Sequence, residues 1–280
     1  MKYISPFKWS GSKSKEIKKI RGLLGQSNLR ICEPFMGTGV VTSVFGADAS
    51  CYGNDLNTDV VNLLWNYSSP LFRPLVDELM TKENMASHDF FYEVRAKFNE
   101  TPNDVGAVRA ARFFFLQNSA HFGLYRLNPK GEYTSTWHFF DTEPKVEERI
   151  ATLRALSAKL VTLDNLPYQD FIAMNGNTIQ SKIDLVFMDP PYLNASHKDY
   201  SVGKGAFTIE DYKALDDWAG YLAKSGVKSI ICNYSTPDDD IIYSNAESIV
   251  RFKTSRSMRL NNFIERESIY VLYGFGNSLL

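Results

Sequence analysis

The run Ile183-Asp184-Leu185-Val186-Phe187-Met188, followed at once by Asp189-Pro190-Pro191-Tyr192, decides the fold of this 280-residue chain. A short apolar run rich in branched and aromatic residues is typical of a buried central strand in a parallel sheet. The acid then stands at the carboxyl end of the strand, where open α/β sheets bind their ligands. The segment therefore predicts a functional site directly after residue 188.

The turn at residues 189–192 is suited to holding a planar amine. Two successive prolines fix φ at about −65° and lack N–H donors, so the turn offers carbonyl oxygens without internal partners. The Asp189 carboxylate adds a further acceptor, and Tyr192 adds an aromatic face. An exocyclic amine on a nucleobase fits this arrangement. Taken alone, such a motif is more often a strand that ends at prolines, with the acid as a turn former, so the neighbouring motifs have to decide.

A glycine turn upstream predicts a nucleoside-type cofactor. Residues 29–41 read as a strand, a turn with Gly37 and Gly39, and the start of a helix whose N–H groups are free. A second short strand at residues 50–54 ends in Asp55, where a Rossmann-like sheet places the carboxylate that binds ribose hydroxyls. The turn lacks the third glycine of the dinucleotide fingerprint. This favours a cofactor with ribose and adenine but no pyrophosphate, such as S-adenosylmethionine.

A third segment, Phe7-Lys8-Trp9-Ser10-Gly11-Ser12-Lys13, precedes an expected helix over residues 14–24 and by itself indicates no more than a helix N-cap. In combination, the chain resembles the Dam-like, alpha-group DNA adenine N6-methyltransferases. Residues 8–13 are similar to the family's Lys-Trp-Ala-Gly-Gly-Lys segment, and residues 33–39 to Glu-Pro-Phe-x-Gly-x-Gly. Asp55-Leu56-Asn57 matches Asp-x-Asn, and the Asp-Pro-Pro-Tyr turn follows in the same order.

The resemblance continues more weakly over nearly the whole chain. Residues 123–133 resemble the family's recognition hairpin, and residues 229–235 its Leu-Ile-Ser-Asn segment. Ser10, Ser12, Phe122 and Thr136-Trp137-His138 depart from the family pattern. These departures leave the recognised DNA sequence open and do not touch the chemistry.

The resemblance implies a Rossmann-like, doubly wound and mostly parallel α/β sheet, the class I methyltransferase fold. The catalytic, S-adenosylmethionine-binding domain is expected at residues 1–69 and 141–280, with an inserted, mainly helical target-recognition domain at residues 70–140. The implied activity is methyl transfer from S-adenosylmethionine to the N6 amine of a flipped-out adenine in duplex DNA. Two alternatives stay open: an amino-methyltransferase of cytosine N4 or RNA, and a catalytically inactive DNA-binding regulator.

The resemblance also assigns site residues. The expected catalytic residues are Asp189, Pro190, Pro191 and Tyr192. The expected cofactor-binding residues are Trp9, Lys13, Glu33, Phe35, Gly37, Gly39, Asp55 and Asp189, with Lys13 pairing with the methionine carboxylate and Asp55 holding the ribose. The expected DNA-binding residues are Tyr125, Arg126, Asn128 and Lys130, although ordinary hairpin roles explain each of them equally well.

The alternation of elements predicts a doubly wound sheet from the residues alone. Strands are expected near residues 29–33, 50–54, 160–163, 183–188, 227–232 and 268–275, and helices near residues 14–24, 39–46, 57–67, 145–157 and 208–224. Between residues 70 and 140 the pattern is mainly helical and ends in a polar hairpin tip, Asn128-Pro129-Lys130-Gly131.

Net charge is −1, which argues against DNA binding, but the charge is uneven along the chain. Residues 1–30 carry eight basic residues against one acid, residues 251–266 carry five against one, and residues 91–131 carry six against three. We expect these segments to form a basic face for the phosphate backbone, with Asp238, Asp239 and Asp240 elsewhere.

Composition narrows the remaining possibilities. No apolar run is long enough to span a bilayer and no secretory signal is visible, so we expect a cytoplasmic protein without a membrane partner. The three cysteines are far apart and have no neighbouring histidine, so we expect small buried residues and no metal site. Duplex DNA is the expected partner, a cognate restriction endonuclease is a candidate one, and the oligomeric state stays open.

Overall fold

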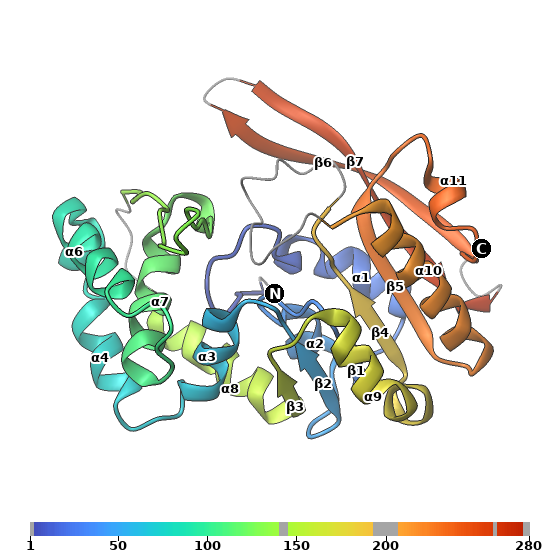
Figure 1. Cartoon of the computed structure of the whole chain (residues 1–280), viewed down its shortest axis with the longest axis horizontal. Helices are drawn as coiled ribbons and strands as arrows, with labels where there is room; N and C mark the ends of the chain where they lie inside the picture. Colours follow the sequence, from blue (N-terminus) through green and yellow to red (C-terminus); the bar gives the residue numbers. More distant parts are fainter. Residues whose placement is uncertain (1–2, 140–144, 193–206, 260–261, 277–280) are drawn as a thin grey trace.

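The computed structural model describes residues 3–139, 145–192, 207–259 and 262–276, with the side chains of residues 254–259 and 262–266 left out. Its centre is a seven-stranded sheet in the order β3-β2-β1-β4-β5-β7-β6 (Figure 1). The strands are β1 (Ile31–Glu33), β2 (Cys51–Asn54), β3 (Leu160–Asp164), β4 (Leu185–Met188), β5 (Lys228–Tyr234), β6 (Ser248–Arg259) and β7 (Asn262–Tyr273). Strands β1 to β5 are parallel, and β7 runs antiparallel between β5 and β6. This order confirms the expected class I methyltransferase fold.

Helices cover both faces of the sheet, which explains why β4 is apolar throughout. Leu185 and Phe187 pack into a core with α1 (Ile17–Leu24) and α2 (Val40–Phe45) on one face. Val186 and Met188 pack on the other face into a core with α9 (Tyr168–Lys182) and α10 (Ile209–Lys224). Successive side chains of a strand point to opposite faces, so a strand buried on both sides needs an unbroken apolar run.

A lobe of four helices forms between α3 (Thr58–Asn66) and α8 (Val146–Lys159), as the helical pattern of residues 70–140 predicts. The helices are α4 (Phe72–Leu79), α5 (Lys82–Ala86), α6 (His88–Asn99) and α7 (Ala107–Ser119), and Figure 1 shows α4, α6 and α7 gathered at the left of the sheet. Phe113 and Phe114 of α7 share one apolar core with Leu63 of α3 and Leu156 of α8. The lobe is therefore packed continuously with the rest of the molecule.

A β-hairpin follows the lobe at the expected place. After the short 3-10 helix η2 (His121–Gly123), Leu127 pairs with Tyr133 in an antiparallel bridge. The Asn128 and Gly131 amides close the turn, donating to the Glu132 and Asn128 carbonyls respectively, each at 2.9 Å. The predicted hairpin tip at residues 128–131 is thus confirmed.

Three elements differ from the sequence expectations. Helix α9 was not expected, because Asn175, Gly176 and Asn177 are poor helix formers and only Phe171 and Ile179 are buried on it. Strand β6 was not expected either, and β7 begins earlier than expected, at Asn262. Strand β6 is an edge strand that pairs with β7 only. Its residue types are therefore constrained by contact with solvent more than by packing in the core.

The basic segments are partly brought together. The Lys19 ammonium of α1 lies 3.9 Å from the ring centroid of Phe252 on β6, so the first and last basic segments are neighbours. The expectation that Asp239 lies away from them is wrong, because Arg251 Nη2 lies 3.2 Å from Asp239 Oδ2. The Asp239 side chain also accepts from the Thr236 amide at the turn after β5, which fixes it beside β6.

Over the described ranges, no helix is long and apolar enough to cross a membrane, and no cluster of His, Cys, Asp and Glu could hold a metal ion. The thiols of Cys32, Cys51 and Cys232 are buried and form no disulfide. They are packed as small apolar residues in three strands, as the sequence predicts.

Candidate active site at the carboxyl ends of β1, β2 and β4

Asp189 lies immediately after β4 and forms an ion pair with Lys13, which is far away in the sequence. The ammonium of Lys13 pairs with Oδ2 of the carboxylate and also donates to the Gly11 carbonyl at 3.1 Å. The other carboxylate oxygen, Oδ1, is buried and has no hydrogen-bond partner in the described part of the chain. One oxygen of Asp189 is thus engaged, and the other is available to a donor.

The electrostatics of this pair follow from its burial. Burial lowers the pKa of Lys13, but the attraction of Asp189 outweighs it and holds that pKa above its ordinary value. Burial raises the pKa of Asp189, and Lys13 opposes the rise. Lys13 is only 3% exposed, and the negative charge of Glu16 also raises its pKa. Removing one partner would leave an uncompensated buried charge, which is strongly destabilising.

The carbonyl oxygens of the two prolines after Asp189 differ in whether a described residue donates a hydrogen bond to them. The Pro191 carbonyl accepts a hydrogen bond from the Tyr212 hydroxyl at 3.2 Å, so the prediction that both carbonyls lack internal partners is wrong for Pro191. The sequence could not show this, because Tyr212 comes from α10, which is distant in the chain. Among the described residues, none donates to the Pro190 carbonyl. Pro190 thus remains an acceptor beside Asp189.

Tyr192 closes the turn with its ring. The ring packs edge-to-face against Tyr234 with 4.7 Å between centroids, and the Lys13 ammonium lies 5.2 Å from its centroid. Burial raises the pKa of the Tyr192 hydroxyl well above its ordinary value, so the side chain is a neutral phenol. The ring is therefore held firmly near the Asp189 carboxylate.

The glycine turn between β1 and α2 is tied to the end of β2 by Asp55. Gly37 and Gly39 have φ of 51° and 59°, the left-handed conformation for which glycine is the usual residue. The Gly37 amide donates to Asp55 Oδ2 at 2.6 Å, and the Asn57 amide donates to Oδ1 at 2.8 Å. A Cβ on Gly37 would lie 3.4 Å from Trp9 Nε1, so Trp9 lies against the turn. The structure brings these four predicted cofactor residues together.

Glu33 and Phe35 flank the same turn. The Glu33 carboxylate accepts from the Thr42 amide at 2.8 Å, which joins the end of β1 to α2, and burial raises the Glu33 pKa to about 7. Phe35 is half-buried, with its ring 5.3 Å from that of Tyr168 and 5.7 Å from that of Phe207. Glu33 is thus held by α2, whereas Phe35 contributes an aromatic wall.

The four predicted DNA-binding residues have different environments. Arg126 and Lys130 are exposed on the hairpin. The Asn128 side chain builds the turn, since its Oδ1 accepts from the Lys130 and Glu132 amides and its Nδ2 donates to Glu132 at 2.5 Å. Tyr125 is directed inward, and its hydroxyl donates to Asp59 Oδ2 at 2.7 Å. The Tyr125 ring also contacts a predicted cofactor segment, lying 5.6 Å from the ring of Trp9.

Two features near the site were not predicted from the sequence. Asp164 ends β3 at the same edge as Asp55, and burial raises its pKa. The sequence did contain a signal for Asp164, because it is an acid at the carboxyl end of a strand. The same pattern identified Asp55 and Asp189. Phe122 is 63% exposed with a φ of 53°, and its ring lies 4.2 Å from that of His121. Backbone strain of this kind leaves no mark in a sequence.

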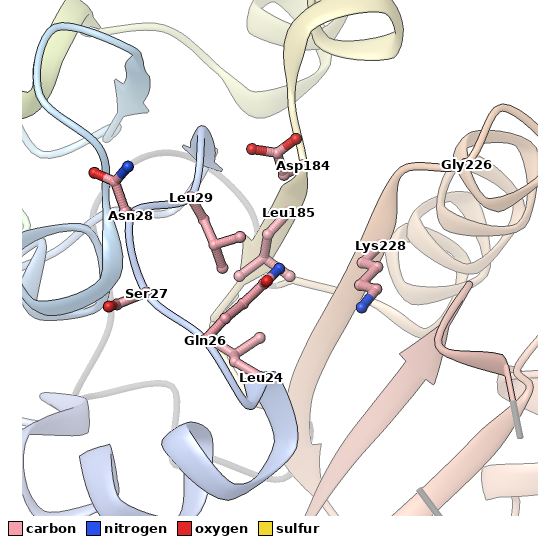
Figure 2. A pocket seen from close by; sticks show the side chains of 9 residues that line it. All are labelled: Leu24, Gln26, Ser27, Asn28, Leu29, Asp184, Leu185, Gly226 and Lys228. Carbon is pink, nitrogen blue, oxygen red and sulfur yellow. The ribbon is translucent and has the colours of Figure 1, made fainter. Parts of the chain in front are cut away.

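A pocket lies at the opposite edge of the sheet (Figure 2). Asp184 precedes β4 and Lys228 begins β5, so the pocket is at the amino ends of the parallel strands. It is lined by Leu24, Gln26, Ser27, Asn28, Leu29, Asp184, Leu185, Gly226 and Lys228. Ligands of such sheets bind at the carboxyl ends, so this pocket is not the candidate active site.

Comparison with known proteins identifies the family of the chain. Residues 9–258 match the family model of the D12 class N6 adenine-specific DNA methyltransferases. The type II methyltransferase M.MjaIII of Methanocaldococcus jannaschii is 28% identical over 257 residues, covering 82% of this chain and 84% of that protein. The DNA adenine methylase of Serratia marcescens is 28% identical over 234 residues, covering 82% and 83%. That of Escherichia coli K12 is 26% identical over 235 residues, covering 82% and 80%.

Among solved structures, the rRNA methyltransferase aviRa of Streptomyces viridochromogenes is 13% identical, with a TM-score of 0.36 over 94% of this chain and 84% of that one. This likeness is too weak to add to the strand order described above.

Proposed function

The chain belongs to the D12 class N6 adenine-specific DNA methyltransferases, and we propose on this basis that it binds S-adenosylmethionine over the glycine turn and methylates a flipped-out adenine held by Asp189. Family membership favours adenine N6 over the cytosine N4 and RNA alternatives. The observation that carries the proposal is Oδ1 of Asp189 at the carboxyl end of β4, which is buried and has no hydrogen-bond partner among the described residues.

The residues around the glycine turn fit the cofactor. Each oxygen of Asp55 accepts one backbone hydrogen bond, and an ionised carboxylate has about four acceptor positions, so positions remain for ribose hydroxyls. The Lys13 ammonium has three N–H donors, and among the described residues Asp189 and Gly11 engage two of them, so the third can donate to the methionine carboxylate. Asp164 is a further acceptor at the same edge. When bound, S-adenosylmethionine supplies an electrophilic methyl group on a positively charged sulfur.

The turn after β4 has the acceptors that the adenine amine needs. The amine has two N–H donors, and Asp189 Oδ1 and the Pro190 carbonyl are two adjacent acceptors. Holding both protons in this way favours a pyramidal nitrogen with an accessible lone pair. The methyl acceptor is then positioned for direct attack, so the reaction needs no covalent enzyme intermediate. Stacking on Tyr192 contributes about 1–3 kcal/mol toward the few kcal/mol that base flipping costs.

The DNA-binding surface is assigned to the helical lobe and its hairpin, residues 70–140, with the catalytic domain formed by the rest of the chain. Arg126 and Lys130 are exposed cations suited to phosphates and base edges. Asn128 supports the hairpin turn, and Tyr125 contributes from inside the protein rather than from its surface. Duplex DNA is the proposed substrate, and the proposed location is the cytoplasm. Because M.MjaIII is named a type II methyltransferase, a cognate restriction endonuclease is a candidate partner.

The test is Asp189→Asn rather than Asp189→Ala, because both substitutions remove the charge that compensates Lys13, but asparagine keeps a hydrogen-bond acceptor for the buried ammonium. The amide oxygen can stay with Lys13, which directs the NH2 group to the position of Oδ1. A donor then faces the adenine amine where an acceptor is needed.

We expect wild-type protein to form N6-methyladenine in methyl-free DNA, measured by mass spectrometry after nuclease digestion. Asp189→Asn should lower the rate by about 100-fold or more, the range found when one transition-state contact is removed. Cofactor affinity, measured by calorimetry, should be largely unchanged. The matched variant Asp55→Ala should instead weaken cofactor binding. An Asp189→Asn variant that methylates DNA at the wild-type rate contradicts the assignment.

A further inference from the structure

Tyr125 connects the recognition hairpin to a buried ion pair. Its hydroxyl donates to Asp59 Oδ2 at 2.7 Å, and Arg109 holds the same carboxylate through Nε, at 2.6 Å from Oδ1, and Nη2, at 3.2 Å from Oδ2. Asp59 is 4% exposed and Arg109 is 7% exposed. The carboxylate is thus fixed in place, and the hairpin is fixed to it.

From Asp59, hydrogen bonds continue to the glycine turn without a gap. The Asp59 amide donates to Asn57 Oδ1 at 3.0 Å, and the Asn57 amide donates to Asp55 Oδ1 at 2.8 Å. The Gly37 amide donates to the other oxygen of Asp55 at 2.6 Å. The Tyr125 hydroxyl is therefore linked to the carboxylate that we assign to the cofactor ribose.

The Tyr125 ring makes a second, independent contact with the same region. It lies 5.6 Å from the ring of Trp9, and Trp9 Nε1 lies against Gly37. The neighbouring backbone is also joined, because the Ser10 amide donates to the Gly123 carbonyl at 3.1 Å. Both ends of the Tyr125 side chain thus lead to the glycine turn, one through a tilted ring contact with Trp9 and one through hydrogen bonds.

We propose that Tyr125 is a positioning residue that couples DNA binding at the hairpin to cofactor binding at the glycine turn, so that each ligand tightens the other. A cofactor that fixes Asp55 and Asn57 also fixes Asp59, and with it the hairpin. DNA binding to a hairpin that is already ordered then loses less conformational entropy, and the converse holds for the cofactor. The inference rests on the proposed function, and Tyr125 acts through Asp59 and Trp9 rather than on the reacting atoms.

The experiment compares affinities with and without the second ligand, because a series of contacts alone does not measure coupling. Calorimetry gives the Kd of S-adenosylhomocysteine for the full chain, alone and with saturating methyl-free DNA of mixed sequence. We expect DNA to tighten this Kd by about tenfold in the wild type, within the usual range of such couplings, and by no more than about twofold in Tyr125→Phe. The Kd for DNA, measured with and without S-adenosylhomocysteine, must change by the same factor.

Tyr133→Phe is the matched control. Tyr133 lies in the same hairpin, with its ring 5.5 Å from that of Tyr125, and its buried hydroxyl donates to Gln117 Oε1 at 2.8 Å instead of to Asp59. This variant therefore also loses a buried phenol hydroxyl, but it keeps the link to Asp55. We expect it to retain the wild-type coupling factor, with thermal unfolding showing that both variants are folded.

The outcomes separate the two proposals. Wild-type protein that forms N6-methyladenine but shows no coupling, or a Tyr125→Phe variant that keeps the full factor, overturns the role of Tyr125 and leaves the proposed function intact. An equal loss of the coupling factor in Tyr125→Phe and Tyr133→Phe also overturns the role of Tyr125, because the effect is then a general loosening of the hairpin. Wild-type protein that methylates no DNA overturns the proposed function instead.

Discussion

Replacing Gly39 with alanine should destabilise the fold for two separable reasons. Gly39 has a φ of 59°, and a Cβ there would lie 2.6 Å from Cδ2 and 2.9 Å from Cδ1 of Leu156, which is fully buried in α8. The left-handed conformation costs about 1–2 kcal/mol for a residue with a Cβ. Overpacking against a buried side chain costs about 1–3 kcal/mol more. Together we expect the free energy of unfolding to fall by about 2–5 kcal/mol.

Denaturant unfolding followed by circular dichroism measures this loss, and two further variants divide it. Gly25 ends α1 with a φ of 65° and has nothing within 4 Å of the position of a Cβ, so Gly25→Ala should lose only the conformational part. In a Leu156→Ala background the overpacking disappears, so Gly39→Ala should there approach the loss seen for Gly25→Ala.

Equal losses for Gly39→Ala and Gly25→Ala in the otherwise unchanged chain would refute the reasoning. Leu156 would then move aside at no cost, and the close packing of α8 against the glycine turn would not constrain the start of α2.

Two other predictions concern pH and strain. Burial raises the pKa of Glu33 to about 7 from 4.5, so the folded state binds this proton more tightly, and stability should fall as pH rises from 4.5 through 7. Glu33→Gln keeps an acceptor for the Thr42 amide and should therefore be more stable than wild type by up to about 3 kcal/mol at pH 8, but not at pH 4.5. A stability difference that is the same at both pH values would contradict this, with denaturant unfolding as the assay. Phe122→Gly should raise the free energy of unfolding by about 1 kcal/mol by relieving the left-handed φ, while weakening DNA binding in a fluorescence anisotropy assay through loss of an exposed aromatic ring. Unchanged DNA affinity would remove Phe122 from the DNA-binding surface.

The centre of the sheet could be predicted because β4 is buried on both faces. That burial produces the unbroken apolar run of β4, and parallel strands place their acids at one end of the sheet, which identified Asp55 and Asp189. Helix α9 buries only two of its residues, and none of the side chains described on β6, residues 248–253, is buried, so these sequences carry a weaker periodic signal.

The partners of the site residues could not be predicted, because they depend on packing between distant segments. Lys13 is separated from Asp189 by 176 positions, and a lysine and an aspartate have the same sequence signature whether or not they meet. In the same way, Tyr125 and Asn128 have side chains suited to DNA, yet Asp59 and Glu132 engage them within the protein. Residue type indicated the chemistry, and tertiary contacts decided which atoms remain for ligands.

The continuous apolar core between the helical lobe and the sheet limits how sequence specificity can change. Phe113 and Phe114 of the lobe pack against side chains of α3 and α8, so a chimera that received residues 70–140 from a relative would also need matching partners on those two helices. Modular exchange of the whole lobe would disturb its packing, whereas exchange of the hairpin tip, where Lys130 is exposed, would not. Under the proposed assignment of DNA recognition to the lobe and its hairpin, new target sequences should therefore arise by substitutions on the hairpin surface.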